Sequence, residues 1–163
     1  MNKLENQIIE YLTENAKYTS AQLSKMTGVS EEEVLSTIEK LEKEGVIVKY
    51  SAIINSSNVD DKRVDALIEV KVKPQQLKGF DAFAEELCAF KEVQSLYLVS
   101  GGFDLAVLVK ANSLNDVAQF VSEKLSVVDG VLSVSTHFIL KKYKIEGQTT
   151  SKDNANGERL IVL

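Results

Sequence analysis

Apolar residues recur at helical spacing along the first thirty residues of the chain. Between residues 3 and 15 they lie four positions apart, which predicts a helix with one buried face. The pair Thr19-Ser20 favours the start of a second, short helix, and Gly28 is expected to end it. The apolar positions that define these helices are Leu4, Ile8 and Leu12 in the first, and Leu23 and Met26 in the second.

A third helix and a strand complete this N-terminal pattern. Ser30 is expected to begin the helix and to form a capping box with Glu33, three residues later. Gly45 stands where a glycine commonly ends a helix, and residues 46–50 are expected to follow as a strand. This order is typical of a winged helix-turn-helix, with a general three-helix protein-interaction module as the alternative. The buried stripe of the third helix is expected to be Val34, Ile38 and Leu41.

The pattern changes after residue 54. Residues 55–63 are polar and aperiodic, which indicates a linker, and beyond them strands and helices alternate as β-α-β-β-α-β. This order predicts a ferredoxin-like domain over residues 64–145. The whole chain is therefore expected to be an α+β protein whose residues 1–54 form the winged helix-turn-helix. The expected strands are residues 66–73, 93–100, 103–110 and 131–140; the expected helices have apolar faces at Phe80, Phe83, Leu87 and Phe90, and at Val117, Val121 and Leu125.

Residues 146–163 form a polar tail that ends in an apolar stretch, residues 160–163. Such a terminus either frays in solvent or docks on a subunit groove or a sheet edge. Both alternatives are compatible with the pattern.

The expected strands of the second domain also predict assembly. Two helices cover only one face of a sheet, yet residues 93–100 and 103–110 place apolar side chains on both faces. The helix-free face is therefore expected to be buried by a second subunit, for which a closed dimer is the commonest arrangement. The opposed sets are Tyr97 and Val99 against Leu96 and Leu98, and Phe103, Leu105, Val107 and Val109 against Ala106 and Leu108.

Composition and charge narrow the classes of function. A single Cys88 and a single His137 provide neither an internal disulfide nor a Cys/His zinc cluster, and no apolar run is long enough to span a membrane. The N-terminus lacks a secretory apolar segment, so a cytoplasmic location is expected. Residues 1–50 hold six lysines against nine glutamates, unlike the basic surface of most nucleic-acid-binding proteins. Nucleophile elbows and phosphate-binding loops are absent from the sequence, so neither an enzyme nor a cofactor is expected.

Two segments of the second domain have a specific pattern: Ser-Gly-Gly-Phe-Asp-Leu at residues 100–105, and Gly-Val-(x)4-Thr at residues 130–136. With the segments Gly28-Val29-Ser30 and Glu44-Gly45-Val46-Ile47 of the first domain, they resemble the Lrp/AsnC (feast/famine) family of transcription regulators over nearly the whole chain. The resemblance implies a homodimer, often assembled into higher even-numbered oligomers. It also implies binding to palindromic double-stranded DNA and to a small effector, typically an amino acid.

The resemblance places the DNA contacts on the third helix. Members of the family commonly carry arginine where this chain has Ser36-Thr37, and residues 1–62 contain no arginine, so the commonest contact to guanine is missing. The glutamates of the first turn either accept hydrogen bonds from cytosine or stabilise the helix dipole. The expected DNA-binding residues are Ser30, Glu32, Glu33, Ser36, Thr37, Lys40 and Lys43.

Gly101 and Gly102 are expected to form a two-residue hairpin turn with positive φ, which would also let a ligand approach the backbone. Asp104 beside the turn can accept a hydrogen bond from an ammonium group, as the recognition of a free amino acid requires. The resemblance places the effector near this turn and near Thr136, at contacts between dimers, although Val134 stands where the family often has threonine. The expected effector-binding residues are Ser100, Gly101, Gly102, Asp104 and Thr136.

Two other functions are compatible with the pattern. An acidic helix-turn-helix that has lost DNA affinity would leave a ligand-sensing or partner-binding oligomer. Sirohaem decarboxylase subunits share the two-domain layout, but a single histidine and few basic residues do not suit a polycarboxylate tetrapyrrole. His137 is expected to be a structural or interface residue, and Cys88 a small buried one.

Overall fold

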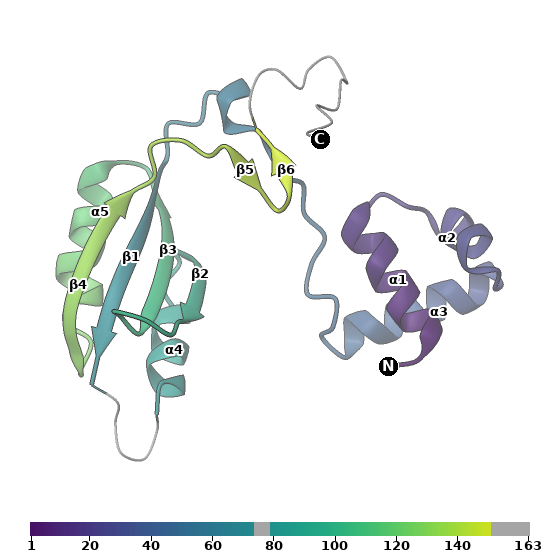
Figure 1. Cartoon of the computed structure of the whole chain (residues 1–163), viewed down its shortest axis with the longest axis horizontal. Coiled ribbons are helices and arrows are strands. Elements are labelled where there is room, and N and C mark those ends of the chain that lie inside the picture. The colour runs from purple at the N-terminus through teal and green to yellow at the C-terminus, as the bar shows by residue number, and fades with distance from the viewer. Residues whose placement is uncertain (74–78, 151–163) are drawn as a thin grey trace. The chain divides into compact units, whose positions relative to one another are not determined.

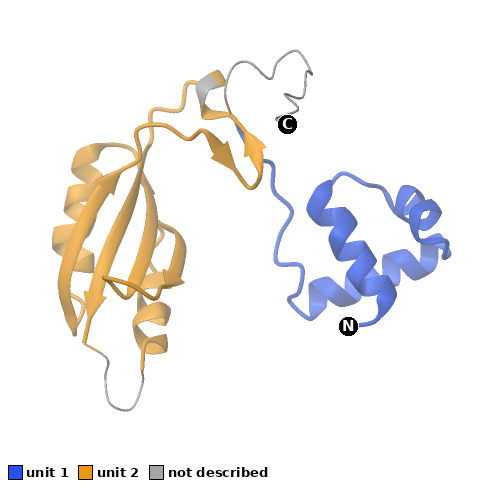
Figure 2. Cartoon of the chain, viewed as in Figure 1, with its two compact units in different colours: residues 1–54 blue, residues 55–163 orange. Residues whose placement is uncertain are grey.

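The chain forms two compact units, Met1–Ile54 and Asn55–Leu163, shown in Figures 1 and 2. The structure is a computed structural model that describes residues 1–73 and 79–150. Each unit has its own hydrophobic core. The expected apolar terminus at residues 160–163 lies outside the described residues.

The first unit packs three helices around a small core. Ile8, Leu23 and Leu41 are fully buried, as is Val34, and the four side chains come from the positions that the helical spacing predicts. Met26, also expected on the apolar side of the second helix, is 39% exposed. The helices are α1 (Lys3–Glu14), α2 (Ser20–Thr27) and α3 (Glu31–Lys43).

Each of these helices begins at a residue whose side chain caps the N-terminus. Asn2 and Thr19 form complete capping boxes at α1 and α2. At α3 the Ser30 hydroxyl oxygen accepts from the Glu33 backbone amide at 3.2 Å. Of the two hydrogen bonds in the expected α3 capping box, this is the one found among the described residues, so the expectation of a capping box is half right.

Residues 46–50, expected as a strand, are not paired with any described segment. Gly45 adopts a φ of +71° and reverses the chain after α3. The backbone amides of Val46 and Ile47 then donate to the Leu41 carbonyl at 2.9 and 3.1 Å, which holds them in a turn. A strand needs a ladder partner, and the described residues of the single chain supply none. The expectation of a strand is therefore wrong for the isolated chain.

The second unit is an antiparallel four-stranded sheet in the order β2-β3-β1-β4 (Figure 1). Its β-α-β-β-α-β connectivity is the ferredoxin-like arrangement that the sequence predicts. The elements are β1 (Val64–Val72), α4 (Asp81–Cys88), β2 (Val93–Leu98), β3 (Leu105–Ala111), α5 (Leu114–Phe120), a π-helical turn (Val121–Leu125) and β4 (Val131–Phe138).

Both helices of this unit pack on the same face of the sheet. Phe83 and Leu87 from α4 share a buried cluster with alternate residues of β1 and β3, and α5 adds Val117 and Phe120. Cys88 is exposed, which corrects the expectation of a buried thiol. The reason is that it follows Leu87 by one position, about 100° around the helix.

The helix-free face has an apolar centre at Tyr97 of β2 and at Ala106 and Leu108 of β3, and it is polar towards β4. Tyr97 lies beside Ala106, and Leu108 lies between Ser95 of β2 and Leu67 of β1. On the other half of the sheet this face is polar, because polar side chains follow Leu67 on β1 and recur along β4, so the apolar surface does not extend across the whole sheet. The polar residues on that half are Glu69, Lys71, Ser133, Ser135 and His137.

Ion pairs tie the end of the expected linker to the sheet. Asp61 accepts from Arg63 Nε at 2.8 Å and from Lys110 Nζ of β3 at 3.0 Å. These two cations hold the pKa of the Asp61 carboxyl well below its usual range. Residues 55–63 also contain a short 3₁₀ turn at Ser56–Asn58, so this segment is more structured than its composition predicts.

A short hairpin occupies the start of the expected polar tail. The strands β5 (Lys144–Ile145) and β6 (Gln148–Thr149) pair around Glu146 and Gly147, whose φ angles are 46° and 80°. Positive φ at both central residues is the geometry of a tight hairpin turn. The hairpin is closed by the Thr150 backbone amide, which donates to the Tyr143 carbonyl at 2.9 Å. The fold therefore continues five residues beyond the expected boundary at residue 145.

Candidate functional site

The N-terminal half of α3 carries most of the expected DNA-binding residues. The hydroxyls of Ser36 and Thr37 donate to the Glu33 carbonyl at 3.0 and 2.7 Å. Each hydroxyl proton is therefore used within the helix, and the hydroxyl oxygens are left as acceptors. Such acceptors match amino groups of cytosine or adenine rather than the acceptor edge of guanine.

The exposed face of α3 is acidic at its start and basic at its end. Glu32, Ser36 and Lys43 are exposed, and at about 100° per residue they lie opposite the buried Val34. Carboxylates in the first turn are favourable next to the positive end of the helix dipole. The same carboxylates repel phosphate, so this half of the helix suits base edges better than the DNA backbone.

Lys40 differs from the other expected contacts because it is paired within the unit. Its Nζ donates to Glu5 Oε1 of α1 at 2.8 Å and lies 3.9 Å from Glu44 Oε1. Glu5 is 4% exposed, and the other oxygen of its carboxylate accepts from the Asn2 backbone amide at 2.6 Å. The Lys40 hydrogen bond lowers the pKa of Glu5, and the same contact raises the pKa of Lys40. This pair joins α1 to α3, so Lys40 helps to position the helix.

The expected effector loop, residues 100–103, is held by backbone hydrogen bonds. The Val99 amide donates to the Asp104 carbonyl at 2.9 Å, and the Asp104 amide donates to the Val70 carbonyl at 3.0 Å. The expected two-residue turn is wrong: four residues span the bend, and neither Gly101 nor Gly102 has a positive φ. The longer loop reverses the chain without left-handed backbone.

Gly101 and Gly102 border open space. Both are exposed, and a Cβ added at either position would meet no heavy atom within 4 Å. Because the turn does not need left-handed backbone and nothing in the chain crowds these positions, the fold of one chain does not require glycine at either of them. Glycine at both positions leaves the backbone open to close approach by another molecule.

The Asp104 carboxylate has a structural role at this loop. Its Oδ2 accepts from the Val72 backbone amide at 2.9 Å, which satisfies the donor at the end of β1. The second carboxylate oxygen, Oδ1, is the candidate acceptor for a ligand ammonium group. Asp104 is therefore both part of the fold and a candidate ligand acceptor.

Thr136 lies away from the loop. It pairs with Ile68 on the β4 side of β1, whereas the loop contacts β1 at Val70 and, through Asp104, at Val72. Ile68 and Val72 are about 13 Å apart along a strand. The structure brings Gly101, Gly102 and Asp104 together, with Ser100 in the same loop, but it does not bring Thr136 to them within one chain.

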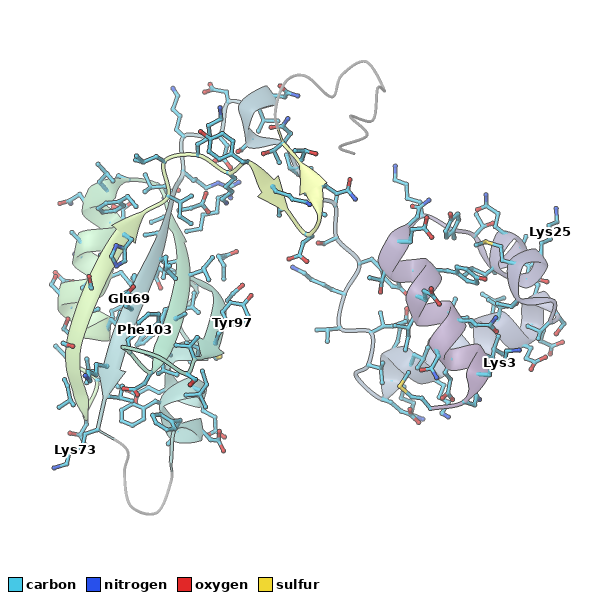
Figure 3. The ribbon with its side chains drawn as sticks, in the orientation of Figure 1. Lys3, Lys25, Glu69, Lys73, Tyr97 and Phe103 are labelled. Carbon is cyan, nitrogen blue, oxygen red and sulfur yellow. The ribbon has the colours of Figure 1, made fainter. Side chains whose placement is uncertain are left out.

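A contact between His137 and Glu69 on the helix-free face was not predicted from the sequence. His137 Nε2 of β4 lies 3.4 Å from Glu69 Oε1 of β1 and 3.3 Å from the Ser135 hydroxyl. Figure 3 labels Glu69 and Tyr97 on this sheet. His137 is exposed at this position, and its expected structural or interface role stays a prediction.

Sequence reasoning also missed Glu5 and Leu35. The pattern Asn2-x-x-Glu5 is a capping-box signature and could have identified Glu5. Leu35 is 53% exposed on α3, beside the buried stripe. Helical spacing alone does not distinguish such a leucine from a residue that packs on the stripe.

Comparison with known proteins assigns both units. Residues 1–48 match the winged helix-turn-helix DNA-binding family, and residues 65–149 match the Lrp/AsnC ligand-binding domain. In the described ranges, residues 1–73 and 79–150, no helix is both long and apolar enough to cross a membrane.

Related proteins match most or nearly all of the chain. The chain is 48% identical to the uncharacterised HTH-type transcriptional regulator YugG of Bacillus subtilis, over 99% of this chain and 98% of that protein. It is 32% identical to the HTH-type transcriptional regulator LrpA of Pyrococcus horikoshii, over 84% and 94% of the two chains. The crystal structure of the regulator NMB0573 of Neisseria meningitidis in complex with L-Met aligns with a TM-score of 0.66 and 26% identity, over 93% and 95% of the two chains. The chain therefore belongs to the Lrp/AsnC family and is an HTH-type transcriptional regulator, not an enzyme.

Proposed function

We propose that this regulator acts as a homodimer that binds palindromic double-stranded DNA through α3 and changes that binding in response to an amino acid held at residues 100–104. The observation that carries the proposal is the exposed N-terminal half of α3, capped by Ser30 in a complete three-helix unit. In helix-turn-helix proteins this part of the second motif helix contacts base edges in the major groove. A two-fold dimer would present two such helices to two half-sites.

The helix-free face of the sheet supports dimer formation. Leu67, Ala106 and Leu108 form an apolar centre on β1 and β3, with Tyr97 beside them on β2. Polar residues of β4 border this centre on one side. An apolar centre with a polar border is the usual composition of a protein interface.

The loop at residues 100–103 supports amino-acid binding. A ligand carboxylate suits the open backbone beside Gly101 and Gly102, and a ligand ammonium suits Asp104 Oδ1. The similar regulator from Neisseria meningitidis was solved with L-Met bound, which favours an amino acid as the class of effector. Since Thr136 lies away from this loop, a ligand that contacts both would need a second subunit.

Ligand and DNA are expected to be coupled through the assembly. An amino acid that binds one arrangement of dimers more tightly would shift the population towards it and reposition the paired α3 helices. By linkage, a fivefold effect of the amino acid on DNA affinity requires a fivefold effect of DNA on amino-acid affinity.

Selection of bound duplexes from random DNA at low salt tests the DNA-binding proposal. A palindromic site with two half-sites about one helical turn apart, or a multiple of that spacing, is the expected result. Failure to enrich any duplex would favour the second candidate, a ligand-sensing or partner-binding oligomer. The observation that favours this second candidate is the negative net charge of residues 1–50, which contain six lysines and nine glutamates.

Lys40 and Lys43 are expected to differ in the salt dependence of DNA binding. Replacing Lys43 with glutamine should reduce the slope of log affinity against log salt by about 0.9 for each copy in contact, because one phosphate contact is lost. Lys40→Gln removes the same charge but should leave the slope unchanged and instead lower the unfolding temperature, since buried Glu5 loses its partner. Fluorescence anisotropy across a salt series and thermal unfolding measure the two effects. An equal change of slope in both variants would contradict the positioning role of Lys40.

Two loop substitutions are expected to separate effector binding from stability. Gly102→Ala should leave the free energy of unfolding within about 0.5 kcal/mol of wild type, since the added Cβ enters open space. Asp104→Asn keeps an acceptor for the Val72 amide but removes the charge. Each change should weaken amino-acid binding about tenfold or more, the usual effect of losing a charged hydrogen bond or a close backbone approach.

A thermal-shift screen of the twenty amino acids on wild type, followed by titration calorimetry on both variants, measures these effects. Asp104→Ala is a poor probe because it also leaves the Val72 amide without its acceptor. A ligand that binds wild type and both variants equally would place the effector elsewhere.

A further inference from the structure

Leu35 is a large apolar side chain on the exposed surface of α3. It is 53% exposed, whereas Val34 beside it is fully buried. At about 100° per residue it projects from the margin of the solvent-facing side, one turn from Glu32 and Glu39. It is the fifth residue of α3 and therefore belongs to the half of the helix that contacts base edges in this motif.

The neighbours of Leu35 limit which bases the helix can recognise. Residues 1–62 contain no arginine, and the two lysines of α3 are in its last turn. Guanine offers two acceptors in the major groove, so the first turns of α3 lack its usual partner. The carboxylates of Glu32 and Glu39 match the amino group of cytosine. The aliphatic side chain of Leu35 matches the only apolar group on a base edge, the 5-methyl group of thymine.

We propose that Leu35 recognises a thymine in each half-site by packing against its 5-methyl group. This inference rests on the proposed binding of DNA through α3 and adds the identity of one base and the residue that reads it. Because the first turns of α3 are acidic, this contact is expected to contribute a larger share of the discrimination between DNA sequences. With few cations to neutralise phosphates, the sequence-independent part of binding is small, and discrimination depends more on base contacts.

The experiment uses the full-length protein and a duplex selected by it from random DNA. Each thymine of a half-site is replaced in turn by deoxyuridine, which removes the methyl group and leaves base pairing and the hydrogen-bonding edge intact. One position in each half-site is expected to lose about fourfold in affinity, the effect of burying one methyl or methylene group. For Leu35→Ala, thymine and deoxyuridine at that position should bind equally.

Two features of the experiment separate recognition from folding. Leu35→Ala should fold normally, because the position is exposed and alanine has a higher helix propensity than leucine. Leu114→Ala is a matched control, since Leu114 is a 56% exposed leucine on α5 of the other unit, and it should retain the fourfold preference for thymine.

The outcomes distinguish this inference from the proposed function. A selected site without any methyl-dependent position would overturn the role of Leu35 and leave DNA binding intact. A methyl preference that persists unchanged in Leu35→Ala would also overturn it, because another residue would then read the thymine. If no duplex is selected at all, the proposed DNA binding and this inference both fail.

Discussion

Replacing Gly130 with alanine is expected to destabilise the second unit by about 3 kcal/mol. Gly130 has a φ of +89°, where an L-residue is strained by about 1–2 kcal/mol. An added Cβ would also lie 2.6 Å from Phe83 Cζ, and this ring is 2% exposed within the core. Moving a packed ring adds about 1–3 kcal/mol. In a unit of this size the midpoint of thermal unfolding should fall by more than about 10 °C, measured by circular dichroism.

Gly147→Ala is the matched control for this effect. Gly147 has a similar φ of +80°, but an added Cβ there meets nothing within 4 Å. Gly147→Ala should therefore be destabilised only by the backbone strain of a positive φ, without the cost of moving a packed ring. Adding Phe83→Leu to Gly130→Ala should recover some of the difference, because the shorter side chain makes room. Equal losses at both glycines would show that the contact with Phe83 does not contribute.

The helices and most strands could be predicted because their causes lie close together in the sequence. Val34 and Leu41 are buried at the spacing of one helix face, and Ser30 caps the helix three residues from the amide it contacts. The order of strands and helices then restricts the second unit to very few topologies. The strand expected at residues 46–50 failed for the opposite reason, since a strand depends on a partner that local sequence does not specify.

The contacts that shape the candidate site join residues far apart in the sequence. The position of Lys40 on α3 suits a phosphate contact, but its Nζ lies 2.8 Å from Glu5 Oε1 of α1, a pairing that local sequence does not reveal. Asp104 was identified by its chemistry, but its bond to the Val72 amide depends on the pairing of β1 with β3. Periodicity predicts which face of a helix or strand a residue occupies, but it does not predict which distant residue that side chain contacts.

The proposed effector site is limited in the same way at the level of assembly. The family pattern contains both Asp104 and Thr136, yet within one chain they contact different parts of β1. The pattern therefore supports a site that more than one subunit completes, as the proposed assembly would provide. This makes the helix-free face, through which subunits are proposed to associate, the surface whose disruption should have the widest effect.

Leu108→Glu is expected to convert the proposed dimer to a monomer of 18.0 kDa. Leu108 lies on the helix-free face between Leu67 of β1 and Ser95 of β2, at the apolar centre proposed for the interface. A carboxylate without a partner in such an interface costs about 3 kcal/mol or more, so the dissociation constant should rise by more than about a hundredfold. Multi-angle light scattering across a concentration series measures the mass, and circular dichroism checks that the sheet still folds.

Leu114→Glu is the control for the Leu108 substitution. Leu114 is exposed at the first turn of α5, on the helix side of the second unit, where a carboxylate is favourable next to the helix dipole. This variant should keep the mass of wild type, while Leu108→Glu should lose both assembly and high-affinity binding to a palindromic duplex, because two α3 helices no longer act together. A wild-type mass of 18.0 kDa at micromolar concentration would contradict the dimer itself. A folded Leu108→Glu protein with the wild-type oligomeric mass would instead show that the subunits associate through a surface other than the helix-free face.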